Sequence, residues 1–256
     1  MTVFYSLISD RILSKEIFSM SKTTYKSNAT RTLVAVGVFC ALAYVCCVLF
    51  HFKVGFLSFD LKDAVMTVAA MLFGPIYGLA MSLIVSTIES LTIGTTEFYG
   101  YIMDILSSVS FICVGSFIYS RKRNMTGALL GMASSVVVMT AVMMGANLLI
   151  TPFYMGVSSA DVAAMIPTLL LPFNLTKAVF NASLVFLLYK PIANALRLAG
   201  FVTMDSKKNK ISVPMDPEHK AKARRSSIIV TVCAAAVCAL ALVYFFVVLK
   251  GSFSLT

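Results

Sequence analysis

The sequence predicts an all-α membrane protein with seven helices, and three observations support this prediction. Apolar residues make up 59% of the 256 positions and charged residues only 12%, whereas an ordinary soluble domain has about a quarter charged residues. Apolar runs of about 20 residues, the length that spans a bilayer, recur along the chain. The basic residues gather in a few segments between these runs. A chain of this composition cannot cover its core with a polar surface, so its expected solvent is lipid.

The N-terminal segment, residues 1–31, precedes the first long apolar run. Residues 3–8 are apolar, but Asp10 and Arg11 interrupt them at once, which is not typical of a secretory signal peptide. The segment is expected to lie in the cytoplasm, either as a short interfacial helix or disordered. The first transmembrane helix is expected to run from Thr32 to Phe50.

The second apolar run, from Leu61 to Phe73, is short. At about 1.5 Å per residue it does not comfortably cross a hydrocarbon core of about 30 Å. It is expected either to recruit part of the preceding loop or to pack as a short helix within the bundle. The segment Gly74-Pro75-Ile76-Tyr77-Gly78 follows it. Its two glycines have the spacing of a membrane helix pair, but the internal proline favours a turn, with Pro75 in the first turn of the third helix.

The remaining apolar runs predict five more helices. The expected segments are a third helix ending near Leu91, a fourth at Gly100–Tyr119, a fifth at Thr126–Ile150, a sixth at Met165–Tyr189, and a seventh at Ile228–Leu249. The seventh has no charged residue and follows a basic linker, residues 196–227. This extra transmembrane helix is expected to occupy residues 228–250. No internal repeat is evident, which weakens a fold built from inverted repeats.

The basic residues predict the orientation of these helices. With the N-terminus in the cytoplasm, five Lys and Arg residues lie in the N-terminal segment, three at Arg121–Arg123, and nine between Lys190 and Arg225. The cytoplasmic side then holds 17 of the 21, as the positive-inside rule requires. The other four are Lys53, Lys62, Lys177 and Lys250. The net charge of +10 is therefore interpreted as membrane topology rather than nucleic-acid binding, and the C-terminus is expected to be external.

Several kinds of chemistry have no matching motif in the sequence. There is no phosphate-binding loop, no His-Glu-x-x-His and no Gly-x-Ser-x-Gly. The chain is therefore expected not to be an enzyme, and active transport would draw its energy from a partner or an ion gradient. The six cysteines lie in apolar runs without zinc-site spacing, and there are only two histidines, so no metal site is expected.

Polar residues on the fifth and sixth helices form the candidate binding site. Asn174, Lys177 and Asn181 are spaced i, i+3 and i+7, which places them on one helix face. A lysine within an apolar span is costly and by default marks a functional site or an internal ion pair. Asparagine side chains both donate and accept hydrogen bonds, so they suit a neutral, flat ligand with polar edges. The expected ligand-binding residues are Asn147, Tyr154, Asn174, Lys177 and Asn181.

Acidic residues near the same helix ends leave other interpretations open. Lys177 could instead snorkel to the surface or pair with a carboxylate such as Glu89. Glu89, Glu97 and Asp104 could line the external mouth or pair with Lys177, and the sequence does not decide between these. Asp60 and Asp63 could form a carboxylate pair, but capping of the second helix is favoured, with Asp60 as N-cap and Asp63 three positions later.

Several short motifs, taken in order, resemble the riboflavin-specific S component of energy-coupling-factor (ECF) transporters. The resemblance covers about residues 30–195 and rests on Phe59-Asp60-Leu61-Lys62-Asp63, Gly74-Pro75-Ile76-Tyr77-Gly78, Ile150-Thr151-Pro152, Tyr154-Met155-Gly156 and Leu171-Pro172-Phe173-Asn174 with Lys177. It implies a six-helix substrate-binding bundle, residues 32–195, to which the seventh helix is an addition. It also implies that riboflavin, or FMN, binds from outside as transported ligand beneath a lid between the first two helices. No cofactor is expected.

The resemblance further implies partners and rival functions. An S component associates with a transmembrane T protein and two cytoplasmic ATPase subunits. The family docks on the T protein through Ala-x-x-x-Ala in its first helix, and the chain has Gly37-x-x-x-Ala41 at that place. The alternatives are an S component for thiamine or biotin, a gradient-driven secondary transporter, and a membrane-embedded enzyme.

Overall fold

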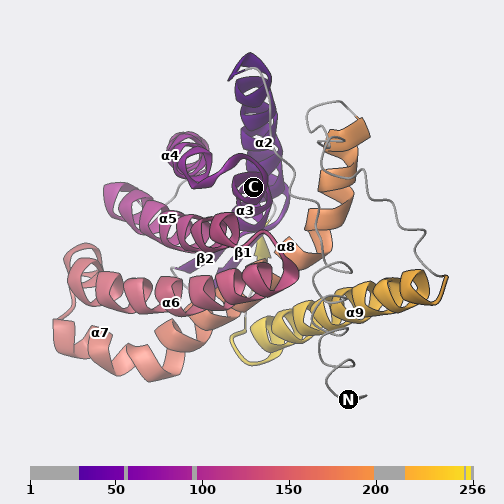
Figure 1. The fold of residues 1–256 in the computed structure, drawn as a ribbon. Helices are drawn as coiled ribbons and strands as arrows, with labels where there is room; N and C mark the ends of the chain where they lie inside the picture. Colours follow the sequence, from indigo (N-terminus) through magenta and orange to yellow (C-terminus); the bar gives the residue numbers. More distant parts are fainter. Residues whose placement is uncertain (1–28, 55–56, 94–96, 199–216, 251, 255–256) are drawn as a thin grey trace.

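The computed structural model describes residues 29–54, 57–93, 97–198, 217–250 and 252–254. Most of the expected N-terminal segment lies outside these ranges. The helices are α2 (Ala29–Leu49), α3 (Lys62–Phe73), α4 (Pro75–Thr92), α5 (Glu97–Arg121), α6 (Met125–Met155), α7 (Ser159–Met165), the π-helical turn η1 (Ile166–Leu170), α8 (Leu171–Leu198) and α9 (Pro217–Val247). The strands are β1 (His51–Val54), β2 (Leu57–Phe59) and β3 (Ser252–Ser254). Figure 1 shows their arrangement.

Six helical segments of the described chain are long and apolar enough to cross a membrane. They are Thr30–Leu49, Pro75–Thr92, Phe98–Arg121, Met125–Met155, Ser159–Leu196 and Ile229–Val247. The first five, together with the shorter α3, make up the six-helix bundle, and the last lies within α9. This confirms the predicted fold class, an all-α membrane bundle followed by an additional C-terminal helix.

The short helix α3 lies in the centre of the bundle, in contact with α2, α4, α5 and α8. Its 12 residues give a length of about 18 Å. Every residue of α3 except Leu72 is buried. Of the two expectations for this apolar run, the short internal helix is therefore confirmed. Small residues such as Ala69 and Ala70 let neighbouring helices approach it, and a Cβ atom added at Gly78 of α4 would lie only 2.7 Å from the Ala70 Cβ.

Helices α5 and α6 pack against each other at two glycines. A Cβ atom added at Gly131 of α6 would lie 2.8 Å from the carbonyl oxygen of Gly115 in α5. A Cβ atom at Gly115 would lie 2.6 Å from Ser135 Oγ. In lipid, where no hydrophobic force pulls helices together, such close approach is a main source of helix association. Asn124 begins α6 by accepting a hydrogen bond from Gly127 N at 2.7 Å.

Two helices extend beyond the boundaries that the sequence predicts. α6 continues past Ile150 and through Pro152, and it ends at Gly156, whose φ of 66° suits a glycine. The predicted sixth helix, Met165–Tyr189, comprises the end of α7, the turn η1 and most of α8, and α8 continues through Pro191 to Leu198. A capping box at Ser158 and Asp161 begins α7, which the apolar pattern alone did not indicate.

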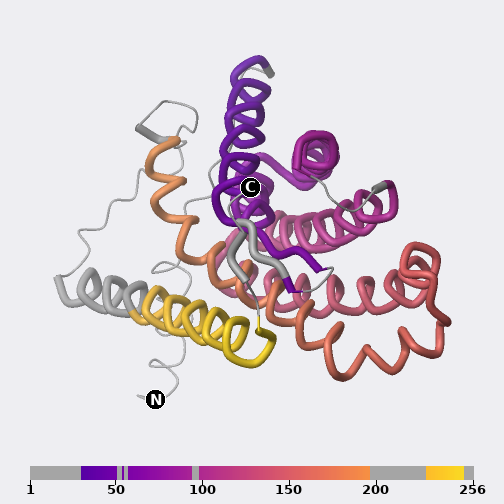
Figure 2. The backbone as a smooth tube through the Cα atoms, turned by 180° about the vertical axis from the view of Figure 1, so that it is seen from behind, coloured from indigo at the N-terminus to yellow at the C-terminus, as the bar shows by residue number. Residues whose placement is uncertain are grey.

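A small antiparallel sheet joins the loop after α2 to the C-terminal part of the chain. β1 pairs with β2 as a hairpin, and β3 pairs with the other edge of β1. α9 begins at Pro217, inside the stretch expected to be a linker, and lies beside α8 (Figures 1 and 2). The C-terminal strand therefore lies at the same end of the bundle as the loop between α2 and α3.

Candidate functional site

A pocket lies at the end of the bundle that carries the small sheet. Its empty volume, which includes space open to solvent, is about 560 Å³. Strand β2 and the adjacent ends of α5, α6 and α8 supply its walls. The lining residues are Leu57, Ser58, Gly100, Met103, Asp104, Ser107, Met143, Asn147, Tyr154, Phe173, Asn174 and Lys177.

The pocket brings together four of the five predicted site residues. Asn147 and Tyr154 come from α6, and Asn174 and Lys177 from α8. The fifth, Asn181, is not part of the lining. It lies one helical turn beyond Lys177, and its Nδ2 donates to the carbonyl oxygens of Asp60 at 3.4 Å and Lys177 at 3.2 Å. The spacing places Asn181 on the same helix face as Asn174 and Lys177, but it lies too far along the helix to reach the pocket.

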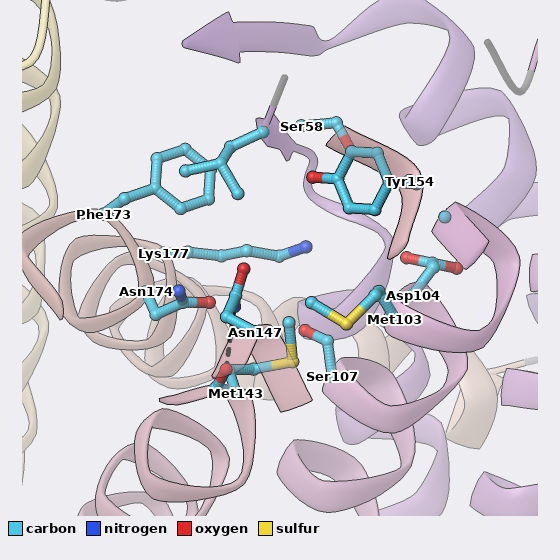
Figure 3. Close-up of a pocket in the computed structure, with 12 residues that line it drawn as sticks. Ser58, Met103, Asp104, Ser107, Met143, Asn147, Tyr154, Phe173, Asn174 and Lys177 are labelled. Atoms are coloured by element: carbon cyan, nitrogen blue, oxygen red, sulfur yellow. Dashed lines mark hydrogen bonds between the residues drawn. The ribbon is translucent and has the colours of Figure 1, made fainter. Parts of the chain in front are cut away.

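The two pocket asparagines are oriented by their own helices. Asn147 Nδ2 donates to Met143 O at 2.7 Å, and Asn147 Oδ1 accepts from Thr151 Oγ1 at 3.0 Å. Asn174 Nδ2 donates to Leu170 O at 2.8 Å. A primary amide has two N–H donors, so each asparagine keeps a second donor beyond the bond to its helix carbonyl. Figure 3 shows the two amides side by side at one wall of the pocket.

Lys177 extends from α8 across the pocket with its ammonium between the asparagines and Tyr154 (Figure 3). The residue is only 5% exposed. Its Nζ lies 3.5 Å from Asp60 Oδ2, so the alternative pairing with Glu89 is wrong. Asp60 Oδ1 also accepts from the backbone amide of Lys62 at 3.1 Å. The favoured capping role of Asp60 is thus partly confirmed, although the same carboxylate faces Lys177.

Beside the pocket, Lys62 forms the ion pairs that the sequence left unassigned. Its ammonium donates to Glu89 Oε2 and, at 2.7 Å, to Asp104 Oδ2. Ser86 Oγ also donates to Asp104 Oδ2. Lys62 is completely buried, and two carboxylates compensate its charge. The side chain of Glu97 lies outside what the structure describes.

The other carboxylate of α3 contacts α5 rather than capping a helix. Asp63 Oδ1 accepts a hydrogen bond from Ser108 Oγ at 2.6 Å, and both side chains are buried. The N-cap position of α3 is Leu61, without a side-chain cap bond. Asp63 therefore lies in the first turn, as predicted, but it connects two helices because burial gives its carboxylate a hydroxyl partner.

Helix α5 contributes four pocket residues, of which the sequence analysis named only Asp104, as a residue that could line the external mouth. Gly100, Met103, Asp104 and Ser107 all line the pocket, and their spacing of three and four residues is that of one helix face. That spacing is the signal that could have identified them. The hydroxyl Oγ of Ser107 is buried and has no hydrogen-bond partner among the described residues, so it can bond to a ligand.

The β1–β2 hairpin, hereafter the lid, closes one side of the pocket. Leu57 and Ser58 of β2 line the pocket, and Leu57 is buried. On the same side, Phe59 packs against Phe180 of α8 with ring centroids 4.9 Å apart. The lid is therefore packed onto the bundle and borders the cavity directly.

The geometry defines a class of protein: a multi-pass helical bundle of the membrane type with a pocket at one end. Comparisons with known proteins identify the family. The family model described as ECF transporter, substrate-specific component, matches residues 31–189. The chain belongs to this family, which confirms the resemblance seen in its motifs. The match ends before α9.

Two individual proteins resemble the chain over about the same extent. The riboflavin transporter RibU of Staphylococcus aureus (strain TCH60) is 26% identical over 176 residues, which cover 65% of this chain and 93% of that protein. A solved structure of the S component of a bacterial ECF transporter superposes with a TM-score of 0.58 at 24% identity. It covers 66% of this chain and 99% of the solved one, which confirms the bundle fold.

Proposed function

We propose that the chain captures riboflavin as the substrate-binding subunit of an ATP-driven ECF importer. The observation that carries the proposal is the convergence of Asn147, Asn174 and Lys177 in one pocket of a chain from this family. The similarity to a riboflavin transporter supports the choice of vitamin. Riboflavin, with FMN as a related candidate, is cargo in this proposal rather than a cofactor.

The pocket chemistry fits the parts of riboflavin. The isoalloxazine ring is flat and uncharged, with carbonyl oxygens and an N–H group on one edge. Asparagine amides can bond to both kinds of group, and the Lys177 ammonium can donate to a carbonyl oxygen. Tyr154 and Phe173 supply aromatic surface for the ring. The hydroxyls of the ribityl chain can bond to Ser107 and Asp104 at the α5 wall.

Titration of the purified chain with riboflavin tests the proposal, because flavin fluorescence is quenched on burial or stacking. Thiamine and biotin serve as competitors that should leave the flavin bound. Flavin that co-purifies with the chain would support the proposal further. Absence of quenching, or displacement by thiamine or biotin at low concentration, would favour an S component for another vitamin.

The energy source is the second part of the proposal. Gly37 and Ala41 lie on the exposed side of α2, and a Cβ atom at Gly37 would have no neighbour within 4 Å. This small-residue pair supports docking to a T protein, which would act with two ATPase subunits. Riboflavin uptake that requires these subunits is the expected result. Uptake by the chain alone in liposomes, driven by an ion gradient, would instead indicate a secondary transporter, and turnover of a substrate would indicate an enzyme.

The proposed orientation places the pocket outside the cell. The N-terminus and Arg121–Arg123 are then cytoplasmic, and the end of the chain near Ser254 is external, as the 17-to-4 distribution of basic residues favours. Cysteines introduced at these points should react with an impermeant maleimide only near Ser254. Labelling of the Arg121–Arg123 loop from outside would reverse the orientation.

A further inference from the structure

The last helix and strand of the described chain contact the lid, although both lie beyond the region that matches the family. β3 pairs antiparallel with β1, with Phe52 opposite Phe253 and Lys53 opposite Ser252. The lid is thus the middle and one edge of a three-stranded sheet whose other edge comes from the C-terminal part of the chain. Without β3, β1 would be an exposed edge with unpaired backbone groups.

A side-chain contact anchors the same segment beneath the lid. Phe245 of α9 is 1% exposed, and its ring stacks on Phe59 of β2 with centroids 5.2 Å apart and an interplanar angle of 27°. The Phe245 ring also lies 6.4 Å from that of Phe173. Phe173 lines the pocket, as does Leu57, a neighbour of Phe59 in β2. One aromatic side chain of α9 therefore supports two walls of the cavity.

The rest of α9 packs against α8 along one narrow face of the helix. Ala234, Cys238, Ala241 and Phe245 recur every three or four residues along α9 and are among its more buried positions, and the buried Leu249 follows the end of the helix. The small residues permit close approach to α8, and Phe245 extends the contact to the lid. Residues on the other faces, such as Leu240 and Val247, are about 70% exposed and suit a lipid environment.

We propose that α9 and β3 form a strap that holds the lid over the pocket, with Phe245 as the positioning residue. The strap gives the lid a second strand partner and, in Phe245, a second aromatic contact on Phe59 beside Phe180 of the bundle. Release of the lid then requires loss of the Phe59–Phe245 stack, so ligand exchange is slowed in both directions. The effect on ligand exchange rests on the proposed riboflavin binding. The contact of the strap with the lid does not depend on that proposal.

The test compares three variants of the full-length chain. Phe245→Ala removes the anchor, Phe245→Leu keeps an apolar side chain of moderate size, and Leu240→Ala is a control on the lipid-facing side of the same helix. Hydrogen exchange of the β1 and β2 backbone amides, measured without ligand, reports on the lid. Stopped-flow flavin fluorescence then gives the association and dissociation rates.

In Phe245→Ala, exchange of the lid amides and the flavin dissociation rate should each rise about tenfold, equivalent to about 1.4 kcal/mol. Amides in α4 and α5 should keep their exchange rates, Phe245→Leu should recover part of the effect, and Leu240→Ala should match the unmodified chain. Unchanged lid exchange in Phe245→Ala would overturn the proposal. An equal rise in the exchange rates of α4 and α5 amides would also overturn it, because Phe245 would then stabilise the whole fold rather than the lid.

The two proposals fail in different ways. If the unmodified chain binds no riboflavin, the proposed function is wrong, and the hydrogen-exchange comparison still decides whether the strap holds the lid. If riboflavin binds but lid exchange is the same in all variants, the strap is wrong and the proposed function stands.

Discussion

The two buried lysines differ in how their charges are compensated. Lys62 is completely buried and donates to both Glu89 and Asp104. Lys177 has one carboxylate, Asp60, at the longer distance of 3.5 Å, and its ammonium faces the pocket. Lys62 is thus satisfied by the protein, whereas Lys177 keeps donors that a ligand can use. An intramembrane lysine marks a functional site or an ion pair; Lys62 is compensated by two carboxylates, whereas Lys177 is the lysine that we propose contacts the ligand.

Replacing the pocket lysine should weaken ligand binding. In Lys177→Met, a charge-assisted hydrogen bond worth about 1.5–3 kcal/mol is lost, and riboflavin affinity should fall roughly 10- to 150-fold. Flavin titration measures the effect, with Lys122→Met, at an exposed position far from the pocket, as the control. An unchanged affinity in a folded Lys177→Met protein would remove this lysine from the site.

Replacing the satisfied lysine should instead reduce stability. Lys62→Met leaves the buried Glu89 and the half-buried Asp104 without their cation, and removing one partner of a buried pair costs about 3–5 kcal/mol. A lower thermal unfolding midpoint and a lower yield are expected. The double variant Lys62→Met/Glu89→Gln should recover part of the loss. A double variant no more stable than Lys62→Met would show that this carboxylate is not the cause.

At the scale of elements, the glycine contact between α5 and α6 sets how closely these helices pack. Gly131 faces the backbone of Gly115, whereas Gly145, on the same helix, is exposed with no atom within 4 Å of an added Cβ. The same substitution should therefore have opposite effects at the two positions. At Gly131 the lack of space decides the effect of a larger side chain on stability, and at Gly145 helix propensity decides it.

Gly131→Ala should destabilise the chain by about 1–3 kcal/mol, because the new methyl group forces two backbones apart. Gly145→Ala should be neutral or stabilise the helix by up to about 1 kcal/mol. Thermal unfolding in one detergent compares the two variants directly. A Gly131→Ala protein as stable as Gly145→Ala would mean that the helices can separate without cost.

The apolar pattern predicted the elements but not all of their ends. Runs of apolar residues placed the long helices of the bundle and the short α3, but not α7, because lipid imposes length and composition on each span. The predicted helix ends were Ile150 and Tyr189, yet α6 and α8 continue beyond them through Pro152 and Pro191. Proline is tolerated within membrane helices because neighbouring groups satisfy the freed carbonyl, and those neighbours are not visible in a local pattern.

The candidate site was predicted in part, since its residues on α6 and α8 were selected and most of its α5 face was not. Asn174 and Lys177 were found by their spacing, and Asn147 by its place near the end of the neighbouring helix. The pairing of Lys62 with Glu89 and Asp104 was not predictable, because it joins three helices whose relative rotation the sequence does not show. The contact of α9 with the lid was missed for the same reason, since it links residues far apart in the chain.

At the scale of the whole molecule, the added helix leaves the proposed docking surface open. α9 lies along α8, and both views of the fold place it away from α2 (Figures 1 and 2). The exposed side of α2 carries Gly37 and Ala41 between larger residues such as Val34 and Val38. A partner helix can therefore approach α2 without displacing α9.

Filling this surface should separate capture from transport. The double variant Gly37→Leu/Ala41→Leu should abolish uptake in cells with the full module and spare riboflavin binding, because close helix contact depends on small residues. Ala141→Leu/Gly145→Leu is the matched control, an exposed pair four residues apart on α6. Lost binding would show that Gly37 and Ala41 seat α2 in its own bundle, and normal uptake would show that this face does not dock.

The shortness of α3 has a consequence for biosynthesis. A segment of 12 residues that begins with Lys62 and Asp63 is a poor candidate for release from the translocon, because it is shorter than a membrane span and carries two charges. The carboxylates that compensate Lys62 belong to α4 and α5, which emerge from the ribosome later. We therefore expect α3 to remain in contact with the translocon until α4 and α5 have been synthesised. Nascent chains arrested before α4 should crosslink from Ala70 to translocon subunits, and chains that include α5 should not. Crosslinking of the shorter chains to lipid would mean that α3 enters the bilayer alone.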